Sequence, residues 1–154
     1  MAQRLISACL LGQACRYDGA SKPAAAVIAQ VAAWRAVGDE VVVVCPEELG
    51  ALGTPRPAAE LRGGDGHAAL SGRATVAREG DGVDVTAAFV AGAYAAAKLA
   101  PRAISAVLKA NSPSCGCSQT TIDGRRQVGD GVFAALLRQR GVAVQTDEDL
   151  ADAR

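Results

Sequence analysis

Three short apolar runs along the chain predict buried β-strands. They cover Leu5–Ala8, Val41–Val44 and Ala103–Leu108. A cysteine lies at or just after the end of each run, and small or turn-forming residues follow, such as Pro46 and Gly116. The polar and apolar pattern therefore places a thiol beyond the carboxyl end of each predicted strand.

Helical spacing lies between the first two runs. Pro23 opens this predicted helix, Val27 and Val31 fall on one face with Trp34, and Gly38 closes it. A strand, a helix and a second strand in this order form a βαβ unit.

Two further helices are predicted nearer the C-terminus. One begins at the cap Asp84–Thr86 and stops before Pro101. Its apolar face is formed by Phe89, Val90, Ala93, Tyr94 and Ala97. The other runs from Val132 to Gly141 and precedes a last strand at Val142–Val144.

The remaining segments carry weaker signals. Glu60–Arg62 reads as a short strand or an extended segment, and residues 67–83 read as a surface excursion or a weak hairpin. Residues 45–60 and 110–130 predict long loops, the second of them glycine-bearing over 116–131, and the acidic tail from Asp147 is expected to fray. Loops this long in a compact domain are usually functional.

Alternation of strands and helices predicts an α/β fold, a Rossmann-like three-layer sandwich with a mostly parallel sheet. At 154 residues the chain is expected to form one domain, residues 1–154. Ligands bind beyond the carboxyl ends of the strands in such sheets. We therefore expect Cys9, Cys45 and Cys115 to share one rim of the sheet.

Composition narrows the function classes. Sixteen basic and sixteen acidic residues give a formal net charge of zero, and no basic run with interleaved aromatics predicts a nucleic-acid footprint. No stretch approaches the length of a membrane span, and no signal peptide precedes the first strand, so the protein is expected in the cytoplasm. Thiols stay reduced there, and five cysteines favour metal or catalytic chemistry over disulfides.

Thiolates at equivalent strand ends favour a shared metal or cluster site, since thiolates suit zinc and iron–sulfur clusters. Cys9, Cys45 and Cys115 have no local CxxC spacing among them, which argues against a structural zinc knuckle. Each of the two other cysteines, Cys15 and Cys117, is an additional ligand, a stand-by thiol or a packing residue.

Several short motifs occur in a fixed order along the chain. They are Ser7–Gly12 with Arg16–Gly19, Cys45–Glu47 with Thr54–Arg56, and Leu108–Lys109 with Ser112–Gly116. With Gly82–Thr86 and Gly129–Val132 they make the chain similar to the 2-thiouracil desulfidase family over essentially its whole length.

That resemblance implies a 4Fe–4S cluster with three cysteine ligands and one open iron, and non-redox hydrolytic removal of sulfur from a thiolated pyrimidine. It implies Cys9, Cys45 and Cys115 as the ligands and Glu47 as the group that transfers protons. It implies that Ser112 lines the substrate site, with Ser114 competing for that role. The expected product pair is uracil and hydrogen sulfide, from a free small-molecule substrate.

The sequence departs from the family pattern in two places. Ala51 stands where the family commonly has glycine, and the stretch Cys117–Arg126 lacks the Tyr-Asp-Gly sequence expected there.

The residues near the motifs leave alternatives open. Tyr17 stacks on a flat base or packs against the protein. Arg16 and Arg56 hold a substrate carbonyl or, the favoured interpretation, brace loops with Asp18 or Glu60. Lys109 is expected to extend from its strand end toward solvent, and His67 is expected to lie on the surface. Gly129–Gly131 before a helix weakly indicates an anion-binding site.

Three alternative functions remain at this stage. The chemistry could act on a thiolated tRNA nucleoside, which the zero net charge disfavours. The protein could carry sulfide or a cluster without catalysis, or it could be a plain α/β domain with buried thiols or a structural zinc. Monomer and homodimer are both compatible with the sequence.

Overall fold

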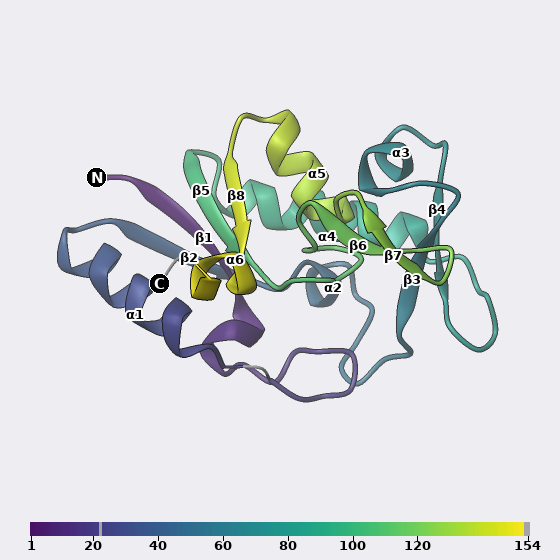
Figure 1. Cartoon of the computed structure of the whole chain (residues 1–154), viewed down its shortest axis with the longest axis horizontal. Helices are drawn as coiled ribbons and strands as arrows, with labels where there is room; N and C mark the ends of the chain where they lie inside the picture. The colour runs from purple at the N-terminus through teal and green to yellow at the C-terminus, as the bar shows by residue number, and fades with distance from the viewer. Residues whose placement is uncertain (22, 153–154) are drawn as a thin grey trace.

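A computed structural model describes residues 1–21 and 23–152 (Figure 1). Four parallel strands form its central sheet in the order β2-β1-β5-β8. They are β1 (Gln3–Ser7), β2 (Glu40–Val44), β5 (Ala103–Leu108) and β8 (Ala143–Thr146). The predicted α/β fold with a parallel sheet is confirmed.

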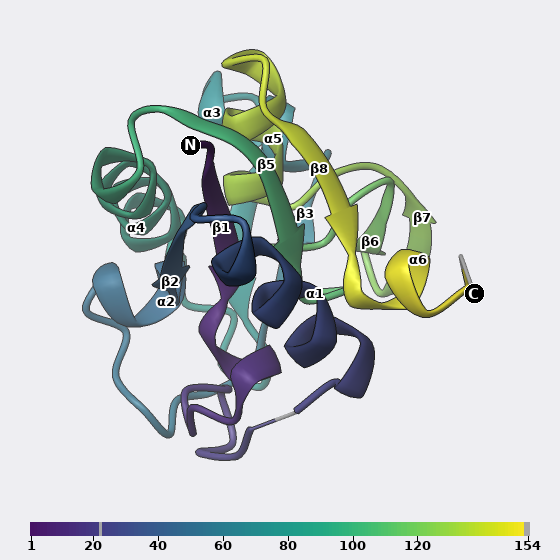
Figure 2. The same cartoon turned by 90° about the vertical axis from the view of Figure 1, so that its left-hand side faces the viewer.

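Helices cover both faces of this sheet, as Figure 2 shows most clearly. One face carries α1 (Ala25–Ala36) and α6 (Asp147–Asp152), and the other carries α4 (Thr86–Leu99) and α5 (Val132–Gln139). Side chains alternate between the faces of a strand, so Leu5 packs with Phe89 and Phe133 while its neighbour Ile6 packs with Val27. Both Leu5 and Ile6 are completely buried, which makes β1 the centre of the three layers.

The predicted apolar face of α4 is correct for Phe89 and Ala93 but wrong for Tyr94, which is 48% exposed. The guanidinium of Arg140 lies 5.5 Å from the centre of the Tyr94 ring. The ring therefore covers a surface cation rather than filling the core.

A second four-stranded sheet was not expected from the sequence. It has the order β4-β3-β6-β7 and mixes parallel and antiparallel pairs. Its strands are β3 (Ala59–Arg62), β4 (Thr75–Arg78), β6 (Gln119–Ile122) and β7 (Arg125–Val128), with α3 (Gly66–Leu70) between β3 and β4.

Residues 116–131 are therefore largely a β-hairpin and not the loop that we predicted. Asp123 and Gly124 connect β6 to β7 with φ of 52° and 77°. An Asp-Gly pair with both φ angles positive is the usual signal for a two-residue hairpin turn. The turn signal is present in the sequence. The flanking strands contain only two apolar residues, so their apolar pattern is too weak to mark them as strands.

The expected fraying of the acidic tail is also wrong. Residues Asp147–Asp152 form α6, which contacts α1 and β5. Thr146 and Asp149 cap each other, since Asp149 Oδ2 accepts from the Thr146 amide at 3.0 Å and Thr146 Oγ1 accepts from the Asp149 amide at 3.1 Å. Asp147 Oδ1 also accepts from the Ala110 amide at 2.8 Å, which ties the tail to the loop after β5.

The loop after β5 is fixed by the beginning of α5. Ser114 O accepts hydrogen bonds from the amides of Phe133 and Ala134, and Pro113 O accepts one from Val132. A side chain at Gly131 would place its Cβ 2.5 Å from Ser114 O. The N-terminal amides of α5 are thus occupied by this loop, so Gly129–Gly131 serves close packing rather than the anion site hinted at by the sequence.

Among the described residues, no helix combines the length and apolar character that crossing a bilayer requires.

Ala51 provides a test of the backbone at the end of α2 (Pro46–Leu49), because it has a φ of 62°. A left-handed conformation strains a residue with a Cβ but not glycine. We expect Ala51→Gly to raise the free energy of unfolding by about 1 kcal/mol, measured by urea denaturation of the metal-free protein.

The matched control is Ala32→Gly in the middle of α1, which should lower that free energy by about 1 kcal/mol. Equal destabilisation by both substitutions would contradict the proposed strain at Ala51.

Candidate functional site

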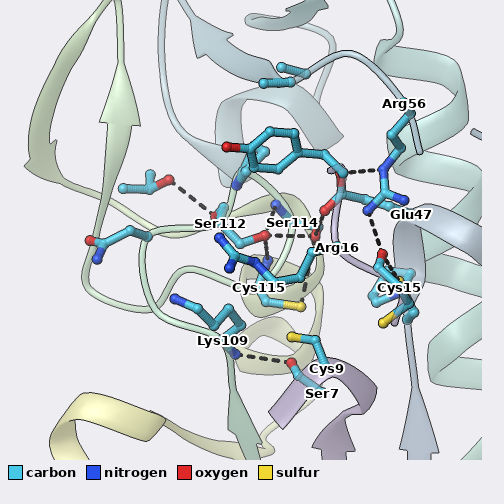
Figure 3. Close-up of a pocket in the computed structure, with 18 of the residues that line it drawn as sticks. Ser7, Cys9, Cys15, Arg16, Glu47, Arg56, Lys109, Ser112, Ser114 and Cys115 are labelled. Carbon is cyan, nitrogen blue, oxygen red and sulfur yellow. Dashed lines mark hydrogen bonds and ion pairs between the residues drawn. The ribbon is translucent and has the colours of Figure 1, made fainter. Parts of the chain in front are cut away.

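A cavity of about 310 Å³ opens beyond the carboxyl ends of β1, β2 and β5. Four of the five cysteines line it, together with Glu47, Arg56 and residues of the Ser112–Cys115 loop (Figure 3). Ala59 and Glu60 of β3 and Thr120 and Thr121 of β6 line another side, so the second sheet forms part of the wall.

The three predicted cysteines reach this cavity from three neighbouring strands. Cys9 lies in a short 3₁₀ helix, Ala8–Leu11, that directly follows β1. Cys45 follows β2 and precedes Pro46, the first residue of α2. Cys115 lies in the loop after β5 and is 5% exposed. The strand-end pattern thus predicted correctly that these thiols lie together.

All five cysteines are free thiols, and the structure separates Cys15 from Cys117. Cys15 lines the cavity, and its sulfur, the Cys45 sulfur and a Glu48 carboxylate oxygen all lie within 4.8 Å of one another. Cys117 is not among the lining residues; its sulfur accepts from Arg138 Nη2 at 2.8 Å. Cys15 is therefore the additional thiol that is close to the predicted ligands.

Burial and mutual proximity disfavour ionisation of these thiols. The hydrogen bond to Cys45 lowers the pKa of Cys15, but a hydrogen bond with Cys9, burial and the charges of Cys9 and Glu48 outweigh it and raise that pKa to about 11. A hydrogen bond with Cys15, followed by burial, raises the pKa of Cys45 far above its usual range. Burial raises the pKa of Cys115 to about 12, although hydrogen bonds from Ser7 and Ser114 oppose the shift.

These thiols suit a cationic, thiophilic group. Only such a group compensates several thiolates held close together, and binding it releases their protons. Sulfur donors with few other ligands favour zinc or iron–sulfur clusters over magnesium or calcium. The donor set of the cavity therefore fits an iron–sulfur cluster.

Glu47 lies beside the thiols in a fixed orientation. Its Oε1 accepts from Arg56 Nε at 3.2 Å, and its Oε2 accepts from Ser114 Oγ at 3.1 Å. The side chains of Glu47 and Arg56 are only 17% and 5% exposed. The predicted acidic residue thus faces the cavity with both oxygens bonded. Its neighbour Glu48 also has both oxygens bonded, by Gln13 and Thr54, but it does not line the cavity.

Arg56 braces loops, as expected, but with a different partner from Asp18 or Glu60. Besides Glu47 it binds the carbonyl oxygen of Cys15 at 3.0 Å and that of Gly53 at 2.8 Å. Among the described residues, Arg16 forms no ion pair, so its expected bracing role is wrong.

Ser112 and Ser114 form one hydrogen-bonded row and do not exclude each other. Their hydroxyl oxygens are 3.0 Å apart, and Ser112 Oγ also accepts from the amides of Ser114 and Cys115. A carboxylate only accepts, so Ser114 donates to Glu47 and is free to accept from Ser112. Ser114 is 1% exposed, whereas Ser112 is half-buried and is the hydroxyl nearer to the open part of the cavity.

The other residues near the motifs divide into two groups. Tyr17 and Lys109 line the cavity; Tyr17 is 43% exposed, and Lys109 Nζ donates to the carbonyl of Ala110 at 2.8 Å. His67 lies outside the cavity, where its Nε2 is 2.8 Å from Asp130 Oδ2. The residues of β3 and β6 in the wall were missed, because nothing in the motifs indicates a second sheet.

Comparisons with known proteins agree with this site. The sequence model of one family, 2-thiouracil desulfurase, matches residues 5–149. The uncharacterized protein YbbK of Bacillus subtilis (strain 168) is 38% identical over 155 residues, which covers 96% of this chain and 97% of YbbK. A solved structure of the 4Fe–4S-dependent thiouracil desulfidase TudS matches with a TM-score of 0.78 and 39% identity, covering 99% of this chain and 97% of the other.

The raised pKa values predict slow alkylation of the thiols in metal-free protein. Iodoacetamide reacts with thiolates, so Cys15 and Cys115 should react little at about pH 7 and about tenfold faster with each added pH unit, until the pH approaches 11 to 12. Peptide mass spectrometry resolves the rate at each cysteine.

A small free thiol is the control, and its rate should level off near its ordinary pKa of about 8.5. A plateau at that same pH for Cys15 and Cys115 would contradict the effect of burial.

Proposed function

We propose, given that this chain belongs to the 2-thiouracil desulfurase family, that it hydrolyses 2-thiouracil to uracil and hydrogen sulfide at a 4Fe–4S cluster. The observation that best supports this function is the set of thiols at adjacent strand ends, beside a fixed carboxylate and a row of hydroxyls. The reaction exchanges one sulfur atom for the oxygen of one water molecule, so no electrons are gained or lost.

The proposal takes Cys9, Cys45 and Cys115 as the cluster ligands. Their strands β1, β2 and β5 are direct neighbours, with β1 in the middle. Ser114, next to Cys115, bonds to Glu47, which follows Cys45 by two residues. Cys45 and Cys115 therefore flank the residues that are available for proton transfer, and Cys9 follows the strand between theirs, whereas Cys15, which lies close to Cys45 and Glu48, does not directly follow a strand.

A cluster held by Cys9, Cys45 and Cys115 would leave one iron without a protein ligand, and that iron would supply Lewis acidity toward the soft thiocarbonyl sulfur. The protein must then manage two protons. Both come from the attacking water, one as its oxygen adds to the carbon and one as the new carbonyl forms, and both end on the departing sulfide, directly or by way of the ring nitrogen.

Glu47 is the proposed acid–base group for these transfers. Arg56 holds one of its oxygens and Ser114 the other, so the carboxylate keeps one orientation while protons move. Ser112 extends the row toward the open part of the cavity, where its hydroxyl can contact water or substrate. Ser114 is the buried link between the two and supports the substrate site from behind.

Tyr17 is the proposed stacking surface for the flat pyrimidine, since it lines the cavity next to the Arg16 side chain. A cavity of about 310 Å³ is at the lower end of the volumes of small-molecule sites. Together with the zero net charge, this volume favours a free thiopyrimidine over a thiolated nucleoside within tRNA.

The ligand assignment predicts which cysteines the cluster needs. Cys9→Ser, Cys45→Ser and Cys115→Ser should each bind well below four irons after anaerobic reconstitution, because a hydroxyl replaces a thiolate ligand. Iron and acid-labile sulfide counts measure the loss, and circular dichroism checks that each variant is folded.

Cys117→Ser is the matched control and should keep its iron, since Cys117 does not line the cavity and is bonded to Arg138. A full iron count in any of the three ligand variants would remove that residue from the ligand set.

The acid–base assignment predicts a chemical defect without cluster loss. Glu47→Gln keeps a similar shape but cannot carry the proton, so kcat for sulfide release from 2-thiouracil should fall roughly 10²- to 10⁴-fold with the iron count unchanged. Uracil formation, measured by chromatography, should fall in parallel.

Glu48→Gln is the neighbouring control and should retain most of the activity, because Glu48 does not line the cavity. Wild-type turnover by cluster-loaded Glu47→Gln would overturn the role of Glu47.

A further inference from the structure

Three cationic side chains line the cavity, and they differ in how fully their nitrogens are bonded. The guanidinium of Arg56 binds the carboxylate and carbonyls described above, and Lys109 Nζ binds the carbonyl of Ala110. Within residues 1–21 and 23–152, the Arg16 side chain has neither a hydrogen bond nor an ion pair. Its one side-chain interaction is with the ring of Tyr17, 5.9 Å from Arg16 Cζ.

An unbonded guanidinium in a cavity wall is available for a ligand. Arg16 is half-buried, and its five N–H donors make no bond to the described part of the protein, so a ligand can replace the water that reaches them. Figure 3 shows its side chain extending into the cavity among the labelled residues. The position calls for an acceptor that the protein itself does not provide.

The backbone presents Arg16 from a fixed position. Its own amide donates to Ala20 O at 3.0 Å. On either side of it, Arg56 holds the carbonyl of Cys15 through Nη2 at 3.0 Å and the carbonyl of Tyr17 through its amide at 2.6 Å. Fixing the backbone on both sides reduces the entropy lost when the side chain binds a ligand.

We propose that Arg16 recognises the exocyclic oxygen of the thiopyrimidine, the carbonyl oxygen at ring position 4 of 2-thiouracil. This inference rests on the proposed function. The two exocyclic atoms of that substrate differ in chemistry: the sulfur is soft and suits iron, whereas the oxygen is hard and accepts hydrogen bonds from a guanidinium.

Recognition of this kind makes Arg16 a specificity-determining residue. A 4-oxo group accepts hydrogen bonds from Arg16, whereas the N–H donors of the 4-amino group of 2-thiocytosine would face the N–H donors of Arg16. A substrate that covers the guanidinium displaces its water, so a substrate without an acceptor leaves the donor unpaired and binds less well. The wild-type protein should therefore prefer 2-thiouracil to 2-thiocytosine.

The first test compares the two substrates in the wild-type protein and Arg16→Gln, both cluster-loaded and with equal iron counts. Arg16→Gln should lower kcat/KM for sulfide release from 2-thiouracil by roughly 10- to 100-fold, the effect of one hydrogen bond to a charged group. It should change kcat/KM for 2-thiocytosine much less, so the preference collapses. Arg16→Lys should recover part of the preference, since its ammonium also donates.

A second measurement avoids catalysis. Uracil carries the same 4-oxo group, and pyrimidin-2-one lacks it, so calorimetry on cluster-loaded protein should show tighter binding of uracil in the wild type. Arg16→Gln should weaken uracil binding and leave pyrimidin-2-one binding unchanged. Arg35→Gln on the exposed last turn of α1 is the matched control and should match the wild type in both assays.

The outcomes separate the two proposals. If the wild-type protein releases no sulfide from 2-thiouracil, the proposed function fails, and uracil binding still decides on Arg16. If the wild type is active and Arg16→Gln affects both substrates equally or neither, the assignment of Arg16 is overturned. A selective loss for the 4-oxo compounds in both assays supports it.

Discussion

The buried guanidinium of Arg56 holds together the loops on which the cavity depends. It belongs to the segment after α2, yet its donors reach Glu47 in α2, the carbonyl of Cys15 in the loop after β1, and the carbonyl of Gly53. A side chain that is 5% exposed and carries a charge is stable only with such partners. Gly53, whose carbonyl Arg56 binds, has a φ of 80°, and the peptide between Thr54 and Pro55 is cis.

The part of the fold that sequence reasoning predicted is the part that follows from local pattern. Continuous apolar runs identify β1, β2 and β5, since parallel strands with both faces covered carry no polar face. Because parallel strands share one carboxyl edge, the common location of Cys9, Cys45 and Cys115 followed from the same pattern. Glu47 and the two serines came from the family resemblance, and the geometry adds the bonds among them.

The part that was missed depends on contacts between segments distant in sequence. The strands β3 and β6 have only one residue pair in register, Leu61 with Ile122, and neither strand is apolar enough to stand out alone. The partner of Arg56 was misjudged because Glu47 and Glu60 are both close to it in sequence, and only the fold decides between them. Helix α6 was missed because acidic composition resembled a frayed tail, although Thr146 and Asp149 carry a reciprocal cap.

The strand order has a consequence for how the protein is made. The first strand synthesised, β1, lies between β2 and β5, so one of its two edges stays unpaired until β5, in the second half of the chain, has been synthesised. The loop with Cys115 becomes ordered later still, because the backbone amides that bind its carbonyls belong to α5. On the ribosome, where N-terminal segments emerge first, Cys9 and Cys45 are exposed before Cys115 has been synthesised. With the proposed ligand set, the cluster site is complete only after nearly all of the chain has been translated.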